Sequence, residues 1–184
     1  MKPFSQMSFH VVAGYILGAL LLGCGRMLSI DYQPTNPWKG QGAVTVAPFR
    51  YEVADKDGVK PREVETNRAA ETELFLSQEI GSFFTEALKK ELVHSGYAVA
   101  PSSPLTIRGA ITRFYVDARN GVERFFELHA TYTVQSQDHA PFTWECSSLQ
   151  YGPNTLAQDS ILIRKGIADC MQRFIQAALD AKVL

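Results

Sequence analysis

The sequence lacks an excess of charge of either sign, because its 18 basic residues are matched by 19 acidic ones and the formal net charge is −1. Proteins that bind nucleic acid along its phosphates carry clustered basic charge, so we expect no nucleic-acid partner. Low-complexity tracts and internal repeats are also missing, and 46% of the residues are hydrophobic. That composition excludes a mainly disordered chain, and 184 residues are enough for one domain with a substantial core.

Catalytic and cofactor motifs are missing as well. The chain has no Gly-x-Ser-x-Gly elbow, no glycine-rich phosphate loop, no His-Glu-x-x-His and no Cys-x-x-Cys. A metal site needs three or four converging ligands, whereas His94, His129 and His139 are expected at a helix end, on a strand and in a turn. Glu127 and His129 could serve as acid and base only inside a cleft, which no pattern predicts. We therefore expect no cofactor and no metal, and we do not expect an enzyme.

The start of the chain, in contrast, has the pattern of an export signal. Lys2 precedes an apolar run from Phe9 to Leu22, which is shorter than the roughly 20 residues needed to span a bilayer. The run ends in Leu-Gly-Cys at residues 22–24, which resembles the lipobox of bacterial lipoproteins. The alternative interpretation is a buried cysteine at the end of a short transmembrane helix.

The lipobox resemblance implies that residues 1–23 are removed as a signal peptide and that Cys24 carries the lipid. A thiolate is a soft nucleophile suited to thioether formation, and acylation of the freed amine makes the membrane anchor stable. Gly25 rather than aspartate follows the cysteine, which in lipoproteins implies the periplasmic face of the outer membrane. Residues 24–42 contain prolines and glycines and are expected to form the lipidated cysteine and a tether. Residues 43–184 then form a single periplasmic domain.

The spacing of apolar residues over 43–184 predicts an α+β domain. Alternation with period two indicates strands, and recurrence at three and four residues indicates helices. Residues 114 and 116 are out of phase with 107 and 111, which predicts a β-bulge at Thr112 or Arg113. We predict an antiparallel-rich sheet of about five strands with two helices packed on one face. The expected strands are 43–49, 97–100, 105–117, 122–135 and 142–151, and the expected helices are 74–95 and 160–182. Gly96 is expected to cap the end of the first helix.

Residues 51–73 carry 11 charges, 7 acidic and 4 basic, in 23 positions. Because charged side chains are costly to bury, we expect an exposed loop here. One interpretation is a solvated loop. The other is a contact arm that orders on binding, with Arg62 and Arg68 as anchors because arginine pairs well with carboxylates. Further along, Phe125 and Leu149 break the inside–outside pattern of their strands, which can mark a partner surface but is also common in itself.

Cys146 and Cys170 are the two cysteines left after the anchor, and an oxidising periplasm would allow them to pair. Both lie on the apolar face of their predicted element. A disulfide needs Cα atoms within about 7 Å, whereas packed layers lie about 10 Å apart. We therefore favour two buried thiols, with a disulfide as the alternative.

From residue 44 to the second helix, the order of elements resembles small outer-membrane lipoproteins of the YajG kind. The segments that carry the resemblance are 44–49, 80–92, 96–99, 105–107 and 114–117, together with Ile111. A related shape occurs in auxiliary lipoproteins of ABC-type lipid transporters and in activators of peptidoglycan synthases. The resemblance implies a membrane-anchored protein that binds other envelope proteins in envelope maintenance or transport. The alternatives are a structural subunit of an envelope-spanning secretion or appendage complex, and a periplasmic enzyme.

Overall fold

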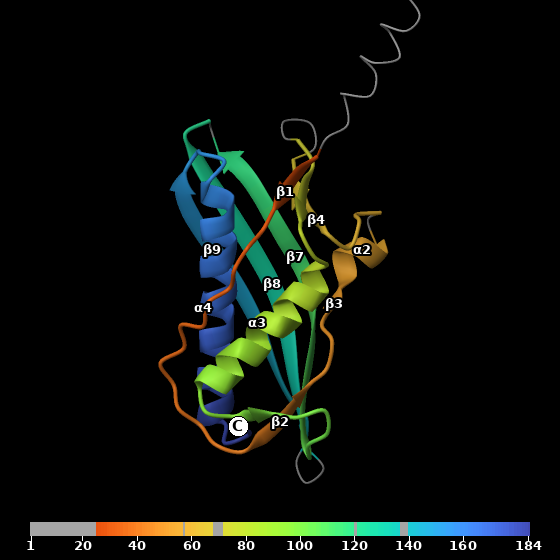
Figure 1. The fold of residues 1–184 in the computed structure, drawn as a ribbon, viewed down its shortest axis with the longest axis vertical. Helices are drawn as coiled ribbons and strands as arrows, with labels where there is room; N and C mark the ends of the chain where they lie inside the picture. Colours follow the sequence, from red (N-terminus) through yellow and green to blue (C-terminus); the bar gives the residue numbers. More distant parts are fainter. Residues whose placement is uncertain (1–24, 57, 68–71, 120, 137–139) are drawn as a thin grey trace, which may run out of the picture.

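In the computed structural model, two helices cover one face of a mixed β-sheet (Figure 1). The structure describes residues 25–56, 58–67, 72–119, 121–136 and 140–184. Within these ranges the sheet has nine strands and there are three helices. None of the helices in this part of the chain is long and apolar enough to cross a membrane.

One side of the sheet is an antiparallel meander, as the sequence predicts. Its strands are β7 (Leu105–Arg119), β8 (Glu123–Ser136) and β9 (Phe142–Pro153), and they are neighbours in that order. The pairing of β7 with β8 shifts register between Ile111 and Arg113, which confirms the predicted bulge.

The other edge of β7 pairs with parallel strands. The sequence predicts strands in this half at 43–49 and 97–100, but neither their parallel pairing nor the further strands. β2 (Ala43–Val46), β3 (Arg50–Tyr51) and β4 (Glu63–Thr66) pair with successive parts of β7. Three further strands extend this half: β6 (Ala98–Val99) beside β2, β5 (Leu74–Leu76) beside β4, and β1 (Arg26–Leu28) beside β5. The expected antiparallel-rich sheet of five strands is therefore wrong in detail. Residues 43–66 run alongside β7 in one direction, interrupted by a short helix, instead of turning back on themselves.

Helices α3 (Ile80–His94) and α4 (Gln158–Asp180) lie on the same face of the sheet, and the short α2 (Glu52–Lys56) lies beside one edge (Figure 1). The pattern of β8 explains this arrangement, since every second side chain from Phe126 to Val134 is buried. Tyr132 of that row stacks on Phe174 of α4, with ring centroids 4.3 Å apart. Burial of this apolar face under the helices drives the assembly of the domain.

The helix expected over residues 74–95 begins later, at Ile80. Leu74 and Leu76 are buried as alternate residues of β5, because a neighbouring strand is there to pair with them. The predicted glycine cap is confirmed. Gly96 has a φ of +96°, and the N–H of Tyr97 donates to the Leu92 carbonyl at 2.9 Å. Helix α4 begins and ends two residues before its expected bounds of 160 and 182.

The charged stretch 51–73 is part of the fold, so the expectation of an exposed loop is wrong. It contributes the end of β3, then α2 and β4, and leads directly into β5. Apolar side chains that lie among its charges are buried: Tyr51, Val53, Val59 and Val64. Arg62 is exposed immediately before β4, whereas Arg68 lies outside the described residues.

The segment expected as a tether packs against α3 instead of standing away from the domain. The fully buried carboxylate of Glu91 accepts a hydrogen bond from the Tyr32 hydroxyl at 2.5 Å. It also accepts the backbone N–H groups of Thr35 and Asn36, each at 3.0 Å. The Asn36 amide in turn donates to Ser95 Oγ at 2.6 Å. Residues 26–42 are thus held by the domain, while Cys24 lies outside the described residues.

Candidate binding face of the sheet

The face of the meander opposite α3 and α4 is the candidate functional site, here called the open face. Side chains of a strand alternate between the two faces of a sheet, so odd-numbered residues of β8 and β9 point away from the helices. The register sets them in rows across the three strands. One row is Tyr115, Glu127 and Leu149, and the next is Asp117, Phe125 and Tyr151.

The bulge in β7 decides which side chains of that strand reach the open face. Before the bulge Ile107 and Ile111 are buried, and after it Phe114 and Val116 are buried. The extra residue changes the parity of the strand, so Arg113 and the odd-numbered residues that follow it point outward. Without this shift, Phe114 would lie on the open face in place of Arg113.

Three rings form an aromatic row on the open face. The ring centroids of Tyr115 and Phe125 lie 5.7 Å apart, and those of Phe125 and Tyr151 lie 6.2 Å apart. Tyr151 is 48% exposed, and the neighbouring Leu149 is 47% exposed. The sequence singled out Phe125 and Leu149, and the structure brings them together with two tyrosines.

Arg113 is held in place beside the aromatic row by two carboxylates. Its Nη1 donates to Glu65 at 3.1 Å and its Nε donates to Glu127 at 3.1 Å. The guanidinium lies over the Tyr115 ring, 4.1 Å from the centroid, where a cation is attracted by the π face. Glu127 also contacts the His129 ring at 3.2 Å, so its carboxylate joins two basic side chains of the open face.

Tyr115 is oriented by its own neighbour on the strand. Its hydroxyl donates to the Asp117 carboxylate at 2.6 Å. Partial burial and this hydrogen bond raise the pKa of Tyr115 to about 12, because both favour the neutral phenol over the charged phenolate. The Tyr115 ring is therefore neutral and fixed under physiological conditions.

On the side of the bulge away from the aromatic row, the open face has a hollow with a volume of about 750 Å³. Small side chains line it, among them Ala110, Thr112 and Thr131, together with the charged side chains of Arg50, Glu52 and Arg108. In the described ranges, no group of three or more His, Cys, Asp or Glu side chains is placed to hold a metal ion. The open face therefore presents a hollow, a row of aromatic rings and the Arg113 guanidinium, which is held in a fixed position.

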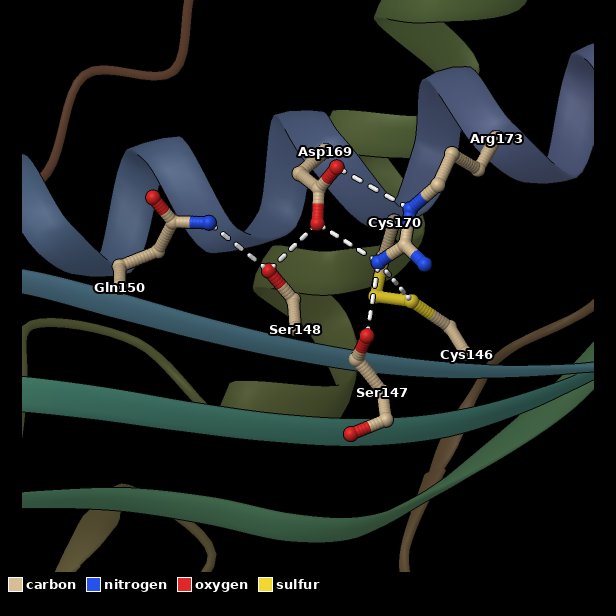
Figure 2. Close-up of a disulfide and its surroundings, with 7 residues drawn as sticks. All are labelled: Cys146, Ser147, Ser148, Gln150, Asp169, Cys170 and Arg173. Atoms are coloured by element: carbon tan, nitrogen blue, oxygen red, sulfur yellow. Dashed lines mark hydrogen bonds and ion pairs between the residues drawn. A yellow bond between two sulfur atoms is a disulfide. The ribbon is translucent and has the colours of Figure 1, made fainter.

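On the opposite side of β9, Cys146 is bonded to Cys170 of α4 (Figure 2). The two Cα atoms lie 5.7 Å apart, so the preference for two separate thiols is wrong. The layer spacing of about 10 Å applies to the helix axis, and a Cα on the near side of a helix is about 2.3 Å closer. Gly166 brings α4 closer still, since a Cβ there would lie 2.6 Å from the Phe126 ring.

Polar side chains surround the disulfide and join α4 to β9 (Figure 2). Arg173 donates to the Ser147 carbonyl at 2.7 Å and to Asp169 at 2.6 Å. Asp169 also accepts the hydroxyl of Ser148 at 2.6 Å, and Gln150 donates to that hydroxyl at 3.0 Å. These contacts hold the strand that carries Leu149 and Tyr151, so the open face is supported from behind.

No protein-family model matches this sequence, and no curated protein sequence matches it. Among solved structures the chain is similar to protein XCC0632 from Xanthomonas campestris, described with the family model DUF330. The TM-score is 0.60 at 11% identity, over 83% of this chain and 94% of that one. The two proteins share a fold.

Other solved structures that match this fold less closely are described as bacterial lipoproteins. A minor lipoprotein from Acinetobacter baumannii matches with a TM-score of 0.41 and 13% identity, over 82% of this chain and 96% of that one. Rare lipoprotein B from Shewanella oneidensis matches with a TM-score of 0.40 and 11% identity, over 78% and 97%.

Proposed function

We propose that this protein is an outer-membrane lipoprotein, anchored on the periplasmic side through Cys24, that binds a protein partner through its open face. Its role would lie in envelope maintenance or transport, without catalysis and without a cofactor. The observation that carries the proposal is the aromatic row with Arg113 fixed beside it, on a sheet face that neither α3 nor α4 covers.

The side chains of the open face are those that contribute most to protein–protein binding. Tyrosine, phenylalanine and arginine are enriched in interface cores, and a few such residues carry most of the binding energy. Arg113 is already held by Glu65 and Glu127, so little side-chain entropy is lost when a partner binds. The strands β7, β8 and β9 are hydrogen-bonded to one another along their length, so they form a rigid base for these side chains.

Site-specific photocrosslinking in the intact envelope tests the binding half of the proposal. A photoreactive residue at Tyr151 should give an adduct with another envelope protein, and Arg113→Ala should reduce the yield of that adduct. The matched control is the same photoreactive residue at Val93, an exposed position on α3. Equal adducts from both positions would contradict the proposal. Adducts only between copies of this chain would instead favour a structural subunit of an envelope complex.

Metabolic labelling with a fatty-acid analogue tests the anchoring half separately. The Cys24→Ser variant should accumulate as an unprocessed precursor without label, because serine does not supply the thiolate that forms the thioether. Undiminished labelling of the variant would contradict lipid attachment at Cys24. That result would leave the open face, and the crosslinking test, unaffected.

A further inference from the structure

The end of the domain next to residue 25 carries apolar side chains that the proposed partner face does not use. They are exposed side chains from three different segments. The exposed fraction is 73% for Val122, 64% for Leu156 and 58% for Met27. Val122 precedes β8, Leu156 lies between β9 and α4, and Met27 is in β1. The ends of these elements lie at the same end of the molecule, opposite the C-terminus (Figure 1). We call the three side chains the apolar end.

Hydrogen bonds and ion pairs hold the three segments together. The N–H of Asn154 donates to the Val122 carbonyl at 3.1 Å, which joins the β9–α4 connection to the start of β8. Asp159, fully buried in the first turn of α4, pairs with Arg124 of β8 and with Arg26 of β1. The apolar end is therefore a rigid unit in which the first described strand is fastened to the sheet and to α4.

The chain leaves this unit only two residues from the proposed anchor. The N–H of Arg26 donates to the Glu73 carbonyl at 2.8 Å, so Arg26 is fixed. Cys24 is two peptide units away, and each unit spans at most about 3.8 Å between Cα atoms. A lipid on Cys24 would keep the start of β1 within several ångströms of the bilayer surface, and with it the end of the domain to which β1 is fastened.

We propose that Val122, Leu156 and Met27 contact the lipid surface. The domain then lies directly on the membrane, with its strands directed away from the bilayer. This inference rests on the proposed anchoring at Cys24. Exposed apolar side chains next to an anchor gain from entering the boundary between headgroups and acyl chains. Glu73 at this end is paired with Lys60 and the exposed Glu123 adds a negative charge. We therefore do not invoke attraction to anionic lipid, and the contact should be insensitive to salt.

Fluorescence quenching from within the bilayer tests the inference on the full-length, acylated protein in phosphatidylcholine vesicles. Cysteine replaces Val122, Leu156 or Val93 one at a time and carries an environment-sensitive dye. No other thiol reacts, because Cys146 and Cys170 are bonded to each other and Cys24 is acylated. Val93 is the matched control, since it is 59% exposed and lies near the end of α3, away from the apolar end.

A spin-labelled lipid should cause a large loss of emission from the dye at residues 122 and 156, and no loss from the dye at residue 93. The loss should be the same in low and high salt. If the protein floats with the vesicles but residues 122 and 156 are no more quenched than residue 93, the domain stands away from the bilayer and the inference is wrong while the anchor stands. If the acylated chain does not float with vesicles, both the anchor and the inference fail.

Discussion

The carboxylate of Glu91 accepts three hydrogen bonds from the segment that precedes β2, one from a hydroxyl and two from backbone N–H groups. Removing it would leave buried donors without an acceptor, which is more costly than losing an exposed contact. We expect Glu91→Ala to lower the free energy of unfolding by about 3 kcal/mol, and Glu91→Gln, which keeps one acceptor, by less. Urea denaturation measures both.

The matched control for that prediction lies on the same helix. Glu86 pairs with Lys89 at 2.7 Å, and its side chain is mostly exposed. Exposed pairs contribute little to stability, so Glu86→Ala should leave the urea midpoint almost unchanged. Equal effects of Glu86→Ala and Glu91→Ala would show that the segment 31–36 is not held by the buried carboxylate.

The disulfide between Cys146 and Cys170 closes a loop with a sequence separation of 24. A loop of this length restricts the unfolded chain enough to stabilise the fold by about 3 kcal/mol. We expect replacement of both cysteines by alanine to lower the unfolding free energy by that order, and reductant to have the same effect on the unchanged protein. If denatured, unreduced protein takes up two alkyl groups per chain, the bond is absent in solution.

The pKa of Tyr115 is raised to about 12 in the folded state, whereas an exposed tyrosine has a pKa near 10. A raised pKa means that the folded state retains the proton more strongly, so this stabilisation is complete below pH 10. It is then lost as the pH rises from about 10 to about 12. The unchanged protein should therefore lose more stability over this window than Tyr115→Phe does. Denaturant melts at pH 9 and pH 11.5 compare the two, and parallel losses would contradict the prediction.

At the scale of elements, the bulge in β7 and the support behind β9 together produce the open face. The bulge turns Arg113 and the two odd-numbered residues that follow it outward. The disulfide and the contacts of Arg173 fix β9 from the helix side. The sequence predicts the bulge because its cause is local, namely a change in the parity of apolar residues. It does not predict that Arg113 lies between Glu65 and Glu127, since Glu65 comes from a strand 48 positions earlier.

The segment from α2 to β4 gives an element-scale prediction. Replacing residues 55–64 with a short glycine–serine linker removes Val59 and Val64 from the core and the Glu63 carbonyl that accepts the Tyr51 hydroxyl. Loss of buried side chains on this scale costs about 3 kcal/mol or more, so we expect a strongly lowered melting temperature. The control variant carries Lys60→Ser and Arg62→Ser, both exposed positions, and should melt like the unchanged protein. An unchanged melt of the linker variant would show that the segment is only a surface loop.

At the scale of the whole molecule, the proposed membrane contact and the open face have a fixed relation. The row of Asp117, Phe125 and Tyr151 lies at the ends of the meander strands that are near the apolar end. A domain resting on its apolar end would hold this row close to the bilayer and the threonine-lined hollow farther away. A partner that binds the aromatic row would then also have to lie close to the membrane surface.

What the sequence determines by itself are the features whose causes are local. Alternation of apolar residues predicts the meander and its bulge, the three- and four-residue spacing predicts the two long helices, and Gly96 predicts the end of α3. The tertiary structure alone decides the rest. Residues 43–66 form parallel strands because the long edge of β7 is free to pair with them. Residues 32–36 pack against α3 because the buried Glu91 carboxylate accepts their hydrogen bonds. Gly166 lets α4 lie close to Phe126 of the sheet, and the disulfide joins the same helix to β9. Both contacts depend on residues far apart in the chain.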